Sequence, residues 1–490
     1  MKKLRLILSS IDGINFTIIA DEFGEERSKL PFSDSRGDSR LFTVLRSLDK
    51  IGTGYKINEK DDRDWMIAEN FLSPENNQFF HPDMAKNIGR KLYESLFIGK
   101  IEKALLTALA EAKGERLHIS IQYDANVIES SYLSLYPWQL AHDGAEFLAD
   151  RQVSFSYLIA HPNLLPQGKR TVEQIKVLLI PSAASNEQYQ PIESKKAVIG
   201  QGLQKAIQGG RIRLLSWYNK ETETPTRERL RAYLTEQDEQ PDIIHFDGHG
   251  FFKKKCPKLE CSESDVAKIF HSLSDFQCKV CKSPLEKAQG FLCFESDSSE
   301  IDYMSGDDFA RLVGQSKPAL VIITACKSAL AYKSDSVFNG VAQKLLRYVP
   351  AVIATPFSIS EKSATDFVEQ FYRALGAKKS LLEAVKLASD AMHYHKYEWY
   401  RLILFLRADR DEEGNLFEFD AIEPPEYDRH DPKIKKLQED IEQLEQEYEG
   451  MSQDARNALT SVMRGRLGKQ ADILYDELSL KKEELHNLLH

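Results

Sequence analysis

Between residues 176 and 406 the sequence predicts an α/β fold, in which a mostly parallel sheet is flanked by helices. Seven short runs rich in Val, Ile and Leu recur there without strict polar alternation, which is typical of strands buried on both faces. These runs begin at Lys176, Arg211, Asp242, Gly290, Ala319, Ala351 and Arg401. Helical patterns lie between them at residues 196–207, 226–237, 305–313, 337–347 and 361–375. This alternation predicts parallel strands joined by helices, with the working site at the carboxyl ends of the strands.

The remainder of the chain divides into segments of different character. Residues 1–165 give a weaker pattern, with candidate strands at 4–9, 16–20, 117–123 and 153–157 and candidate helices at 82–98 and 101–112. Residues 166–406 form the α/β half, and residues 407–431 are polar and acidic, as expected of a linker. From 432 to 490 the apolar residues recur at heptad spacing, which predicts a C-terminal helical hairpin of coiled-coil type. Its apolar positions are Ile434, Leu437, Ile441, Leu444, Tyr448 and Met451, then Leu467, Ala471, Leu474, Leu478, Leu485 and Leu488, with Lys481 interrupting the second set.

Composition narrows the class of protein. The 490 residues are 42% hydrophobic and 29% charged, with a formal net charge of -10, which disfavours a nucleic-acid surface as the main partner. No apolar run reaches about 18 residues, so no membrane span is expected. The N-terminal apolar run is short, lacks a small-residue cleavage site, and is better interpreted as a first strand. Six cysteines, four of them clustered, suit a reducing compartment, and we expect a cytoplasmic protein.

Two predicted strands end in residues suited to catalysis. The run DIIHF leads into Asp247-Gly248-His249-Gly250, and the run LVIITA leads into Cys326. If these strands are parallel neighbours, both ends emerge at one edge of the sheet. A nearby imidazole can take the proton of a thiol and so make it nucleophilic. The sequence therefore predicts a dyad in which His249 is the general base and Cys326 the nucleophile. The backbone N–H groups of Gly250 and Cys326 are the candidate oxyanion donors.

Other interpretations of these residues are weaker. A lone cysteine at a strand end is more often buried filler than a nucleophile, and it is the pairing with His249 that favours catalysis. A zinc site using His245 and His249 is disfavoured, because an i, i+4 spacing suits ligands on a helix. We interpret His245 as a structural strand residue.

The same residues resemble a known family. HFDGHG together with ITACKSA resembles the CHAT branch of the caspase-like (clan CD) cysteine peptidases, which includes relatives of separase and has bacterial members. The stretch YPWQL at 136–140, followed by HDG at 142–144, is similar to the Pro-Trp-Glu-Leu stretch that precedes the catalytic half in that family. Together the matches span about residues 130–406. Gln139 departs from the family, in which an acid is usual, and no tetratricopeptide repeats are found.

The resemblance implies a caspase-like sandwich in which the N-terminal half is a degenerate companion of the catalytic half. It also implies the same roles for His249 and Cys326.

Four cysteines interrupt the catalytic half. Cys256, Cys261, Cys278 and Cys281 are spaced C-x4-C-x16-C-x2-C, and two close pairs separated by a loop suit tetrahedral zinc coordination. We expect a structural zinc knuckle within residues 252–287 that overhangs the active-site edge and helps to select the substrate. Unpaired surface cysteines remain the alternative, and a disulfide is disfavoured in a reducing compartment. Cys293 lies inside a predicted strand and is expected in the core.

The leading functional hypothesis is an endopeptidase that cuts a protein partner. Two alternatives stay open: a catalytically silent caspase-like interaction module or scaffold acting through its C-terminal helices, and another thiol hydrolase such as a transacylase. Glu295, Asp297 and Asp302 follow a core strand and are candidates for a pocket that accepts a basic P1 residue, although exposed acids are usually only solvated.

The C-terminal helices have their own alternatives: they pack on the body of the protein, form a homodimer, or dock a partner. Similar appendages on bacterial CHAT proteases look like adaptors that bind sensor proteins in defence or cell-death pathways. On that resemblance we expect an antiviral-defence or cell-death effector that is activated when a sensor or adaptor protein recruits it.

Overall fold

The computed structural model describes most of the chain in two compact units, Met1–Glu418 and Phe419–His490. The described residues are 2–12, 14–33, 39–51, 57, 60–73, 80–124, 133–160, 169–182, 203, 206–207, 210–218, 223–236, 239–258, 261, 269–271, 275–286, 289–297, 301–325, 338–355, 357, 359–392, 398–407, 414–419, 432–457, 474 and 481.

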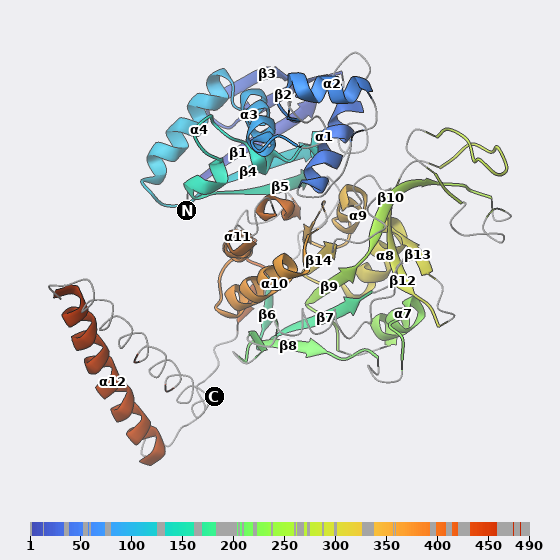
Figure 1. The fold of residues 1–490 in the computed structure, drawn as a ribbon. Helices are drawn as coiled ribbons and strands as arrows, with labels where there is room; N and C mark the ends of the chain where they lie inside the picture. The colour runs from blue at the N-terminus through green and yellow to red at the C-terminus, as the bar shows by residue number, and fades with distance from the viewer. Residues whose placement is uncertain are drawn as a thin grey trace. The chain divides into compact units, whose positions relative to one another are not determined.

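An eleven-stranded sheet runs through the first unit in the order β3-β2-β1-β4-β5-β16-β15-β14-β9-β7-β8 (Figure 1). Its N-terminal strands are β1 (Lys2–Ser10), β2 (Asn15–Ala20), β3 (Gly24–Lys29), β4 (Leu117–Asp124) and β5 (Val153–Ala160). Its other strands are β7 (Ile175–Pro181), β8 (Ile212–Leu215), β9 (Ile243–Gly248), β14 (Leu320–Ala325), β15 (Ala351–Ala354) and β16 (Ile403–Arg407). One sheet therefore joins the N-terminal half to the half that carries the predicted site.

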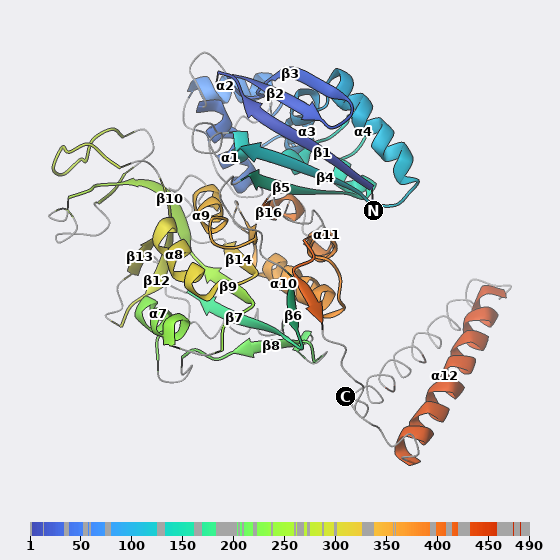
Figure 2. The same ribbon diagram turned by 180° about the vertical axis from the view of Figure 1, so that it is seen from behind.

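In the N-terminal half, β1, β4 and β5 are parallel, and β2 and β3 add an antiparallel edge. Its helices are α1 (Ser39–Lys50), α2 (Lys60–Ala68), α3 (Met84–Leu96) and α4 (Gly99–Ala112). Figures 1 and 2, which view opposite sides, agree that α3 and α4 cover one face of β1–β3. β3 is not among the strands expected from the sequence. The GEERSK strand lies at the sheet edge with every residue at least partly exposed, so it lacks an apolar pattern.

In the half that carries the predicted site, β7, β8, β9, β14 and β15 are parallel, and β16 runs antiparallel to β15. The helices are α7 (Arg227–Glu236), α8 (Gly306–Ser316), α9 (Phe338–Leu345), α10 (Glu361–Gly376) and α11 (Leu381–Met392). Alternate residues of β9 meet different layers: the His245 ring stacks on Tyr372 of α10, whereas Phe246 contacts Phe309 of α8. The predicted mostly parallel α/β sandwich is confirmed, with α8 and α10 on opposite faces of the sheet.

A second, antiparallel sheet has the order β11-β10-β12-β13. It contains β10 (Gly250–Lys255), β11 (Phe270–His271), β12 (Gln289–Glu295) and β13 (Ile301–Ser305). The apolar run at Gly290 is therefore a buried strand as predicted, but it is β12 of this sheet and not a strand of the parallel one. Burial on both faces gives the same continuous apolar pattern in either sheet. A short pair, β6 (Arg170–Val172) with β17 (Phe417–Phe419), completes the strands that the structure describes.

The second unit contains α12 (Pro432–Asn457). Leu437 and Ile441 are buried and pack with Leu444, as the heptad pattern predicts for the first helix. Lys481, which interrupts the second heptad set, forms an ion pair with Asp440 of α12 at 3.0 Å. Apart from Leu474 and Lys481, both in helical conformation, the predicted second helix lies outside the described residues. No helix in the described ranges is both long and apolar enough to cross a membrane.

Candidate active site and cysteine cluster

His249 stands where the two sheets of the first unit meet. It follows Gly248, the last residue of β9 in the parallel sheet, and precedes Gly250, the first residue of β10 in the antiparallel sheet. Its carbonyl oxygen accepts a 2.9 Å hydrogen bond from the N–H of Cys293 on β12, and its side chain is buried. The base predicted from the sequence is thus fixed by backbone pairing on both sides.

The strand that leads to Cys326 is the direct neighbour of β9. β14 runs parallel to β9, with Thr324 opposite Asp247 and Ala325 opposite Gly248. The next residues in the two sequences are Cys326 and His249. Cys326 itself, with its N–H predicted as an oxyanion donor, lies outside the described residues, so the dyad stays a prediction.

The glycine before the histidine has a packing role. A Cβ atom at Gly248 would lie 2.7 Å from Cβ of Ser182 and 2.8 Å from the Phe246 ring, too close for any side chain. Ser182 is tied into the site, because its N–H donates to the Asp247 carbonyl at 2.7 Å and its hydroxyl donates to the Cys293 carbonyl at 2.6 Å. Gly248 therefore lets the end of β7 close over the end of β9.

Cys293 is the cysteine beside His249 in the described structure, and it is unsuited to be the nucleophile. Its side chain is fully buried in β12, as expected of a core residue, and this burial raises the pKa of its thiol to about 12. Only the thiolate is a good nucleophile, and at neutral pH Cys293 is a thiol.

His245 has the structural role predicted for it. Its Nδ1 lies 3.1 Å from the Tyr372 hydroxyl and its Nε2 lies 3.2 Å from the Thr324 hydroxyl. Burial lowers the pKa of His245 to about 3, so the ring is neutral at physiological pH. Both ring nitrogens are engaged by protein hydroxyls, which supports the rejection of a zinc site at this position.

The three acids predicted to line a substrate pocket lie in different surroundings. Glu295, the last residue of β12, is buried and forms a β-bridge with Thr226 just before α7. Asp297 is bound at 2.8 Å by Arg229, and Asp302 lies 3.6 Å from Arg227, so arginines of α7 already neutralise both. The pocket stays a prediction for all three acids.

The four cysteines of the insertion converge in space. The Sγ atoms of Cys256, Cys261, Cys278 and Cys281 all lie within 4.8 Å of one another. The Cys256–Cys281 and Cys261–Cys278 sulfur distances are 3.5 and 3.9 Å. A regular tetrahedron with metal–sulfur bonds of about 2.3 Å has sulfurs about 3.8 Å apart, which both values approach. Disulfides need about 2.05 Å, so the geometry favours a metal ion over two disulfide bonds.

The protein around the sulfurs also suits a metal site. Cys256, Cys261 and Cys278 are nearly inaccessible and pack with Ile269, while Cys281 is half-buried. The turn after Cys278 is closed by the Lys282 N–H donating to the Cys278 carbonyl at 3.0 Å. Hydrogen bonds from Ser283 lower the pKa of Cys281 to about 6, which favours its thiolate, whereas hydrogen bonding with Cys281 raises the pKa of Cys261 to about 12. A bound metal requires the thiolate form of its cysteine ligands. This buried four-cysteine cluster is able to bind a metal ion.

The YPWQL segment lies at the junction of the two halves. Gln139 is buried; its side-chain amide donates to the Tyr400 carbonyl at 2.7 Å, and its carbonyl oxygen accepts from the Tyr157 hydroxyl. Gln139 thus bridges β5 to the 3-10 turn Trp399–Arg401 that precedes β16. The segment also packs closely against α3 at Gly89. A Cβ atom at that position would lie only 2.2 Å from the Leu140 carbonyl oxygen.

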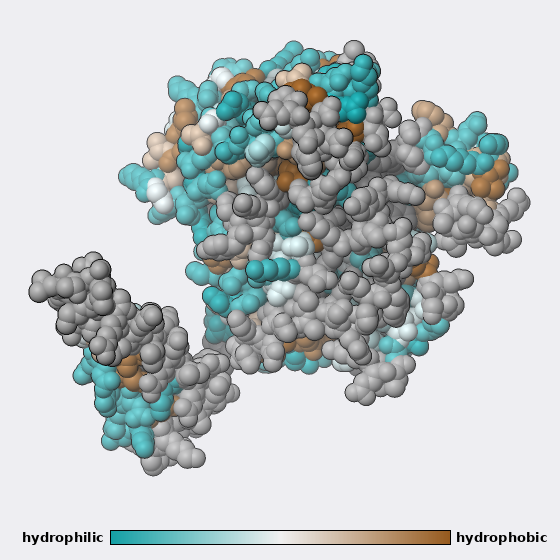
Figure 3. Space-filling view, in the orientation of Figure 1, coloured by the Kyte–Doolittle hydropathy of each residue, from teal (hydrophilic) through white to brown (hydrophobic). Residues whose placement is uncertain are grey.

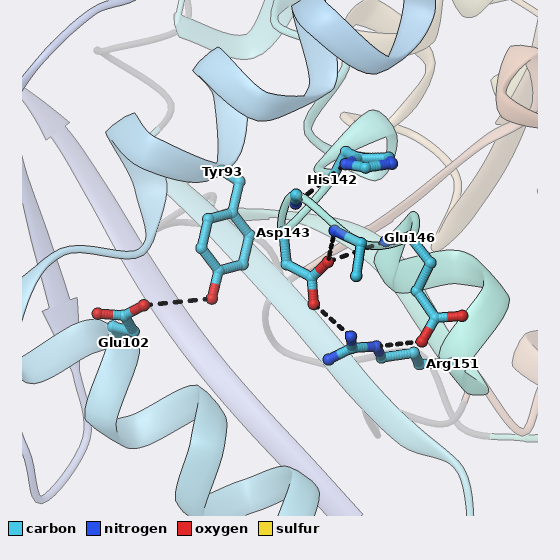
Figure 4. Close-up of polar contacts among 8 residues, drawn as sticks. Tyr93, Glu102, His142, Asp143, Glu146 and Arg151 are labelled. Carbon is cyan, nitrogen blue, oxygen red and sulfur yellow. Dashed lines mark hydrogen bonds and ion pairs between the residues drawn. The ribbon is translucent and has the colours of Figure 1, made fainter.

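The HDG residues that follow form a rigid turn without a nucleophile (Figure 4). Asp143 accepts from the N–H groups of Ala145 and Glu146 at 2.9 and 3.0 Å, and Arg151 pairs with both Asp143 and Glu146. His142 accepts from the Gly144 N–H at 3.0 Å, and burial lowers its pKa. Tyr93 and Glu102 lie beside the turn, and burial raises the pKa of Tyr93 to about 12. All the described contacts of this turn are structural.

Comparison with known proteins decides the family. The sequence matches the CHAT domain over residues 86–423, more than half of the 490-residue chain. The chain belongs to the CHAT family. The match begins well before residue 130, and it includes most of α3 and all of α4 in the N-terminal half. Membership of the CHAT family suggests a caspase-like cysteine protease.

Two solved structures are also similar, both of the separase–securin complex of Saccharomyces cerevisiae. The first is 12% identical and the second 11%, each with a TM-score of 0.39. They cover 85% and 83% of this chain, and this chain spans 30% of each of those chains. No curated protein sequence matches.

Proposed function

We propose that this CHAT protein is a cysteine endopeptidase that uses His249 as its base and Cys326 as its nucleophile to cleave a protein partner. The observation that carries the proposal is the pairing of Ala325 with Gly248 in parallel strands, since the next residues are the cysteine and the histidine. The exclusion of Cys293, whose thiol is buried and protonated, leaves Cys326 as the nucleophile on this edge.

The chemistry follows the usual order for a thiol protease. His249 takes the proton of the Cys326 thiol, and the thiolate attacks the carbonyl carbon of the scissile peptide bond. The N–H groups of Gly250 and Cys326 are proposed to stabilise the oxyanion. The protonated His249 then donates its proton to the leaving amine as the C–N bond breaks. Water, deprotonated by His249, hydrolyses the resulting thioester and releases the second product.

The test uses single substitutions and two readouts. Cys326→Ala and His249→Ala should each lower the rate of peptide cleavage by several orders of magnitude, because members of a catalytic unit act together. Cys293→Ala is the matched control, since it removes a neighbouring buried thiol and should leave cleavage within a few-fold of the native rate. Normal cleavage of the protein substrate by either dyad variant would refute the assignment.

The alternative function is a catalytically silent interaction module, and one experiment separates it from the protease. An electrophilic peptide should label Cys326 in the native protein and fail to label it in His249→Ala. A native protein that forms no adduct at Cys326 would support the silent scaffold.

We also propose that the cysteine cluster holds one structural zinc ion. A set of four sulfur ligands with nearly tetrahedral spacing suits zinc, which in such closed sites stabilises the fold. β10 links this cluster directly to the active-site edge, since its six residues run from Gly250 to Lys255, a length of about 20 Å.

The surface of the cluster supports a role in choosing the substrate. Phe276 is 84% exposed and Val280 is 50% exposed, and Lys254 lies 5.0 Å from the centre of the Phe276 ring. Figure 3 shows hydrophobic residues on this part of the molecule, beyond the end of β10. We propose that a protein substrate contacts this surface as well as the dyad.

The partner and the setting are proposals that rest on the family. We propose that the C-terminal helices, residues 432–490, dock a sensor or adaptor protein, and that the enzyme serves bacterial defence or cell death when recruited. Among the described side chains of α12, charged positions such as Lys435 and Glu439 are exposed, and a narrow apolar seam is formed by Leu437, Ile441 and Leu444. So small a seam is marginal alone, and a partner helix would stabilise it.

A further inference from the structure

A buried chain of hydrogen bonds lies one step below the proposed dyad. The Thr324 hydroxyl on β14 lies 2.9 Å from the Asp247 carboxylate on β9 and 3.2 Å from Nε2 of His245. The other His245 nitrogen lies 3.1 Å from the Tyr372 hydroxyl of α10. All four side chains are at most 2% exposed. Asp247 is two residues before His249, and Thr324, its partner in the ladder, is two residues before Cys326.

The chemistry of these groups fixes the direction of the chain. An ionised carboxylate only accepts, so the Thr324 hydroxyl donates to Asp247. Its hydrogen is then in use, and the Thr324 oxygen accepts from Nε2–H of His245. A neutral imidazole carries one hydrogen, which leaves Nδ1 of His245 to accept from the Tyr372 hydroxyl. With an ionised Asp247, each link therefore donates toward Asp247, and the chain ends on its buried carboxylate.

We infer that Asp247, oriented by Thr324, is a positioning residue that stabilises the protonated form of His249. The inference rests on the proposed dyad, for which it supplies the third group. Asp247 is the penultimate residue of β9 and His249 directly follows the last one, so the two residues lie about 7 Å apart along the backbone. A nearby carboxylate favours the imidazolium, which helps His249 to take and hold the proton of the thiol.

Few other charges compete with Asp247 at this position. The described elements that pack on β9 are β7, β12, β14, α8 and α10. The buried titratable groups of these elements are Tyr372, Cys293 and Glu295, and β9 itself adds His245. His245, Tyr372 and Cys293 are uncharged at neutral pH. Asp242, at the opposite end of β9, is paired with Arg170 at 2.8 Å. Asp247 and Glu295 are thus the buried carboxyl groups near the carboxyl end of β9.

The test measures the reactivity of Cys326 without any substrate. Full-length protein is alkylated with iodoacetamide from pH 5 to 9, and the rate is followed by mass spectrometry of the peptide that carries Cys326. Asp247→Asn removes the charge and keeps the size. It should slow alkylation at pH 6.5 by about tenfold and move the inflection of the pH profile about one unit upward, because the thiol then keeps its proton.

A second pair of variants separates positioning from folding. Thr324→Val removes the hydroxyl that orients Asp247 and should shift the profile in the same direction, whereas Thr324→Ser keeps the hydroxyl and should restore the native profile. The matched control is Ser156→Ala in the N-terminal half, which removes the hydroxyl 2.9 Å from Nε2 of the buried His118 and should leave the profile unchanged.

The outcomes are distinct. A native pH profile in folded Asp247→Asn overturns the inference, and if that variant fails to fold, equal profiles for Thr324→Val and Thr324→Ser overturn it instead. A Cys326 that reacts no faster than a free thiol in the native protein would instead refute the proposed function, and with it the basis of this inference.

Discussion

Replacing Gln139 by glutamate tests why this chain departs from its family at that position. The Gln139 amide donates to the Tyr400 carbonyl at 2.7 Å, and its oxygen accepts from the Tyr157 hydroxyl. A glutamate carboxylate can still accept from Tyr157, but it faces the Tyr400 carbonyl with a second acceptor in place of a donor. Since position 139 is buried, water does not replace the lost hydrogen bond.

The magnitude follows from that geometry. An uncompensated buried charge costs about 3 to 5 kcal/mol, so Gln139→Glu should lower the free energy of unfolding by about that much at pH 7.5. The alternative for the protein is to keep the carboxyl protonated, in which case it can donate to Tyr400. The pKa of the new carboxyl is then raised above its unfolded value. The loss of unfolding free energy is therefore small below the unfolded pKa. It grows as the pH rises toward the folded pKa and is constant above it.

The assay is urea denaturation of the full chain at pH 4.5 and pH 7.5, with native protein measured beside each variant. Gln122→Glu is the matched control, because Gln122 accepts from the guanidinium of Arg5 at 3.0 Å and a carboxylate there gains an ion pair. The control should be neutral or slightly more stable at pH 7.5. If Gln139→Glu is as stable as native protein at pH 7.5, or if its loss of stability is larger at pH 4.5, the donor role of Gln139 is wrong.

Three further predictions concern the metal, the pocket and the C-terminal helices. Protein purified without chelators should contain one zinc per chain. The double variant Cys278→Ser, Cys281→Ser should release this zinc while the circular dichroism spectrum of the main fold persists. A zinc content near zero in the native protein contradicts the site. Glu295→Gln should lower kcat/KM for peptides with a basic P1 residue by at least about tenfold and change little for uncharged P1, because a desolvated carboxylate recognises the cation; equal losses for both would remove Glu295 from the pocket. A chain ending at Glu426 should keep its zinc and the labelling of Cys326 but lose activation by any protein that binds residues 432–490; full activity of the dilute, isolated full-length enzyme would argue against recruitment.

The sequence alone determined the elements whose signal is local. Nearly continuous apolar runs specified β7, β9, β14 and β15, because a strand covered on both faces has few polar positions. The cysteine spacing was an equally local signal. Pairs three and five residues apart already bring thiols within reach of one ion, and the cluster at Cys256, Cys261, Cys278 and Cys281 is observed. The placement of His249 at a strand end followed from the same reasoning.

Other features were decided by contacts between distant segments. β3 has no apolar pattern because its partner is β2 along a single exposed edge. The assignment of β12 to the antiparallel sheet depended on β10, which pairs with it across the cysteine insertion. The role of Gln139 depends on Tyr400, 261 positions away, whose carbonyl oxygen accepts a hydrogen bond from the Gln139 amide.

The hydrogen-bond chain from Tyr372 to Asp247 shows the same limit most clearly. Asp247 is visible in the sequence as the residue two before His249, but nothing local says whether its carboxylate faces solvent or the core. That was decided by the register of β14 against β9 and by the docking of α10, which enclose the carboxylate with a hydroxyl donor. Hydrophobic periodicity records which residues are buried, whereas the partner that satisfies a buried polar group is chosen only when distant strands and helices come together.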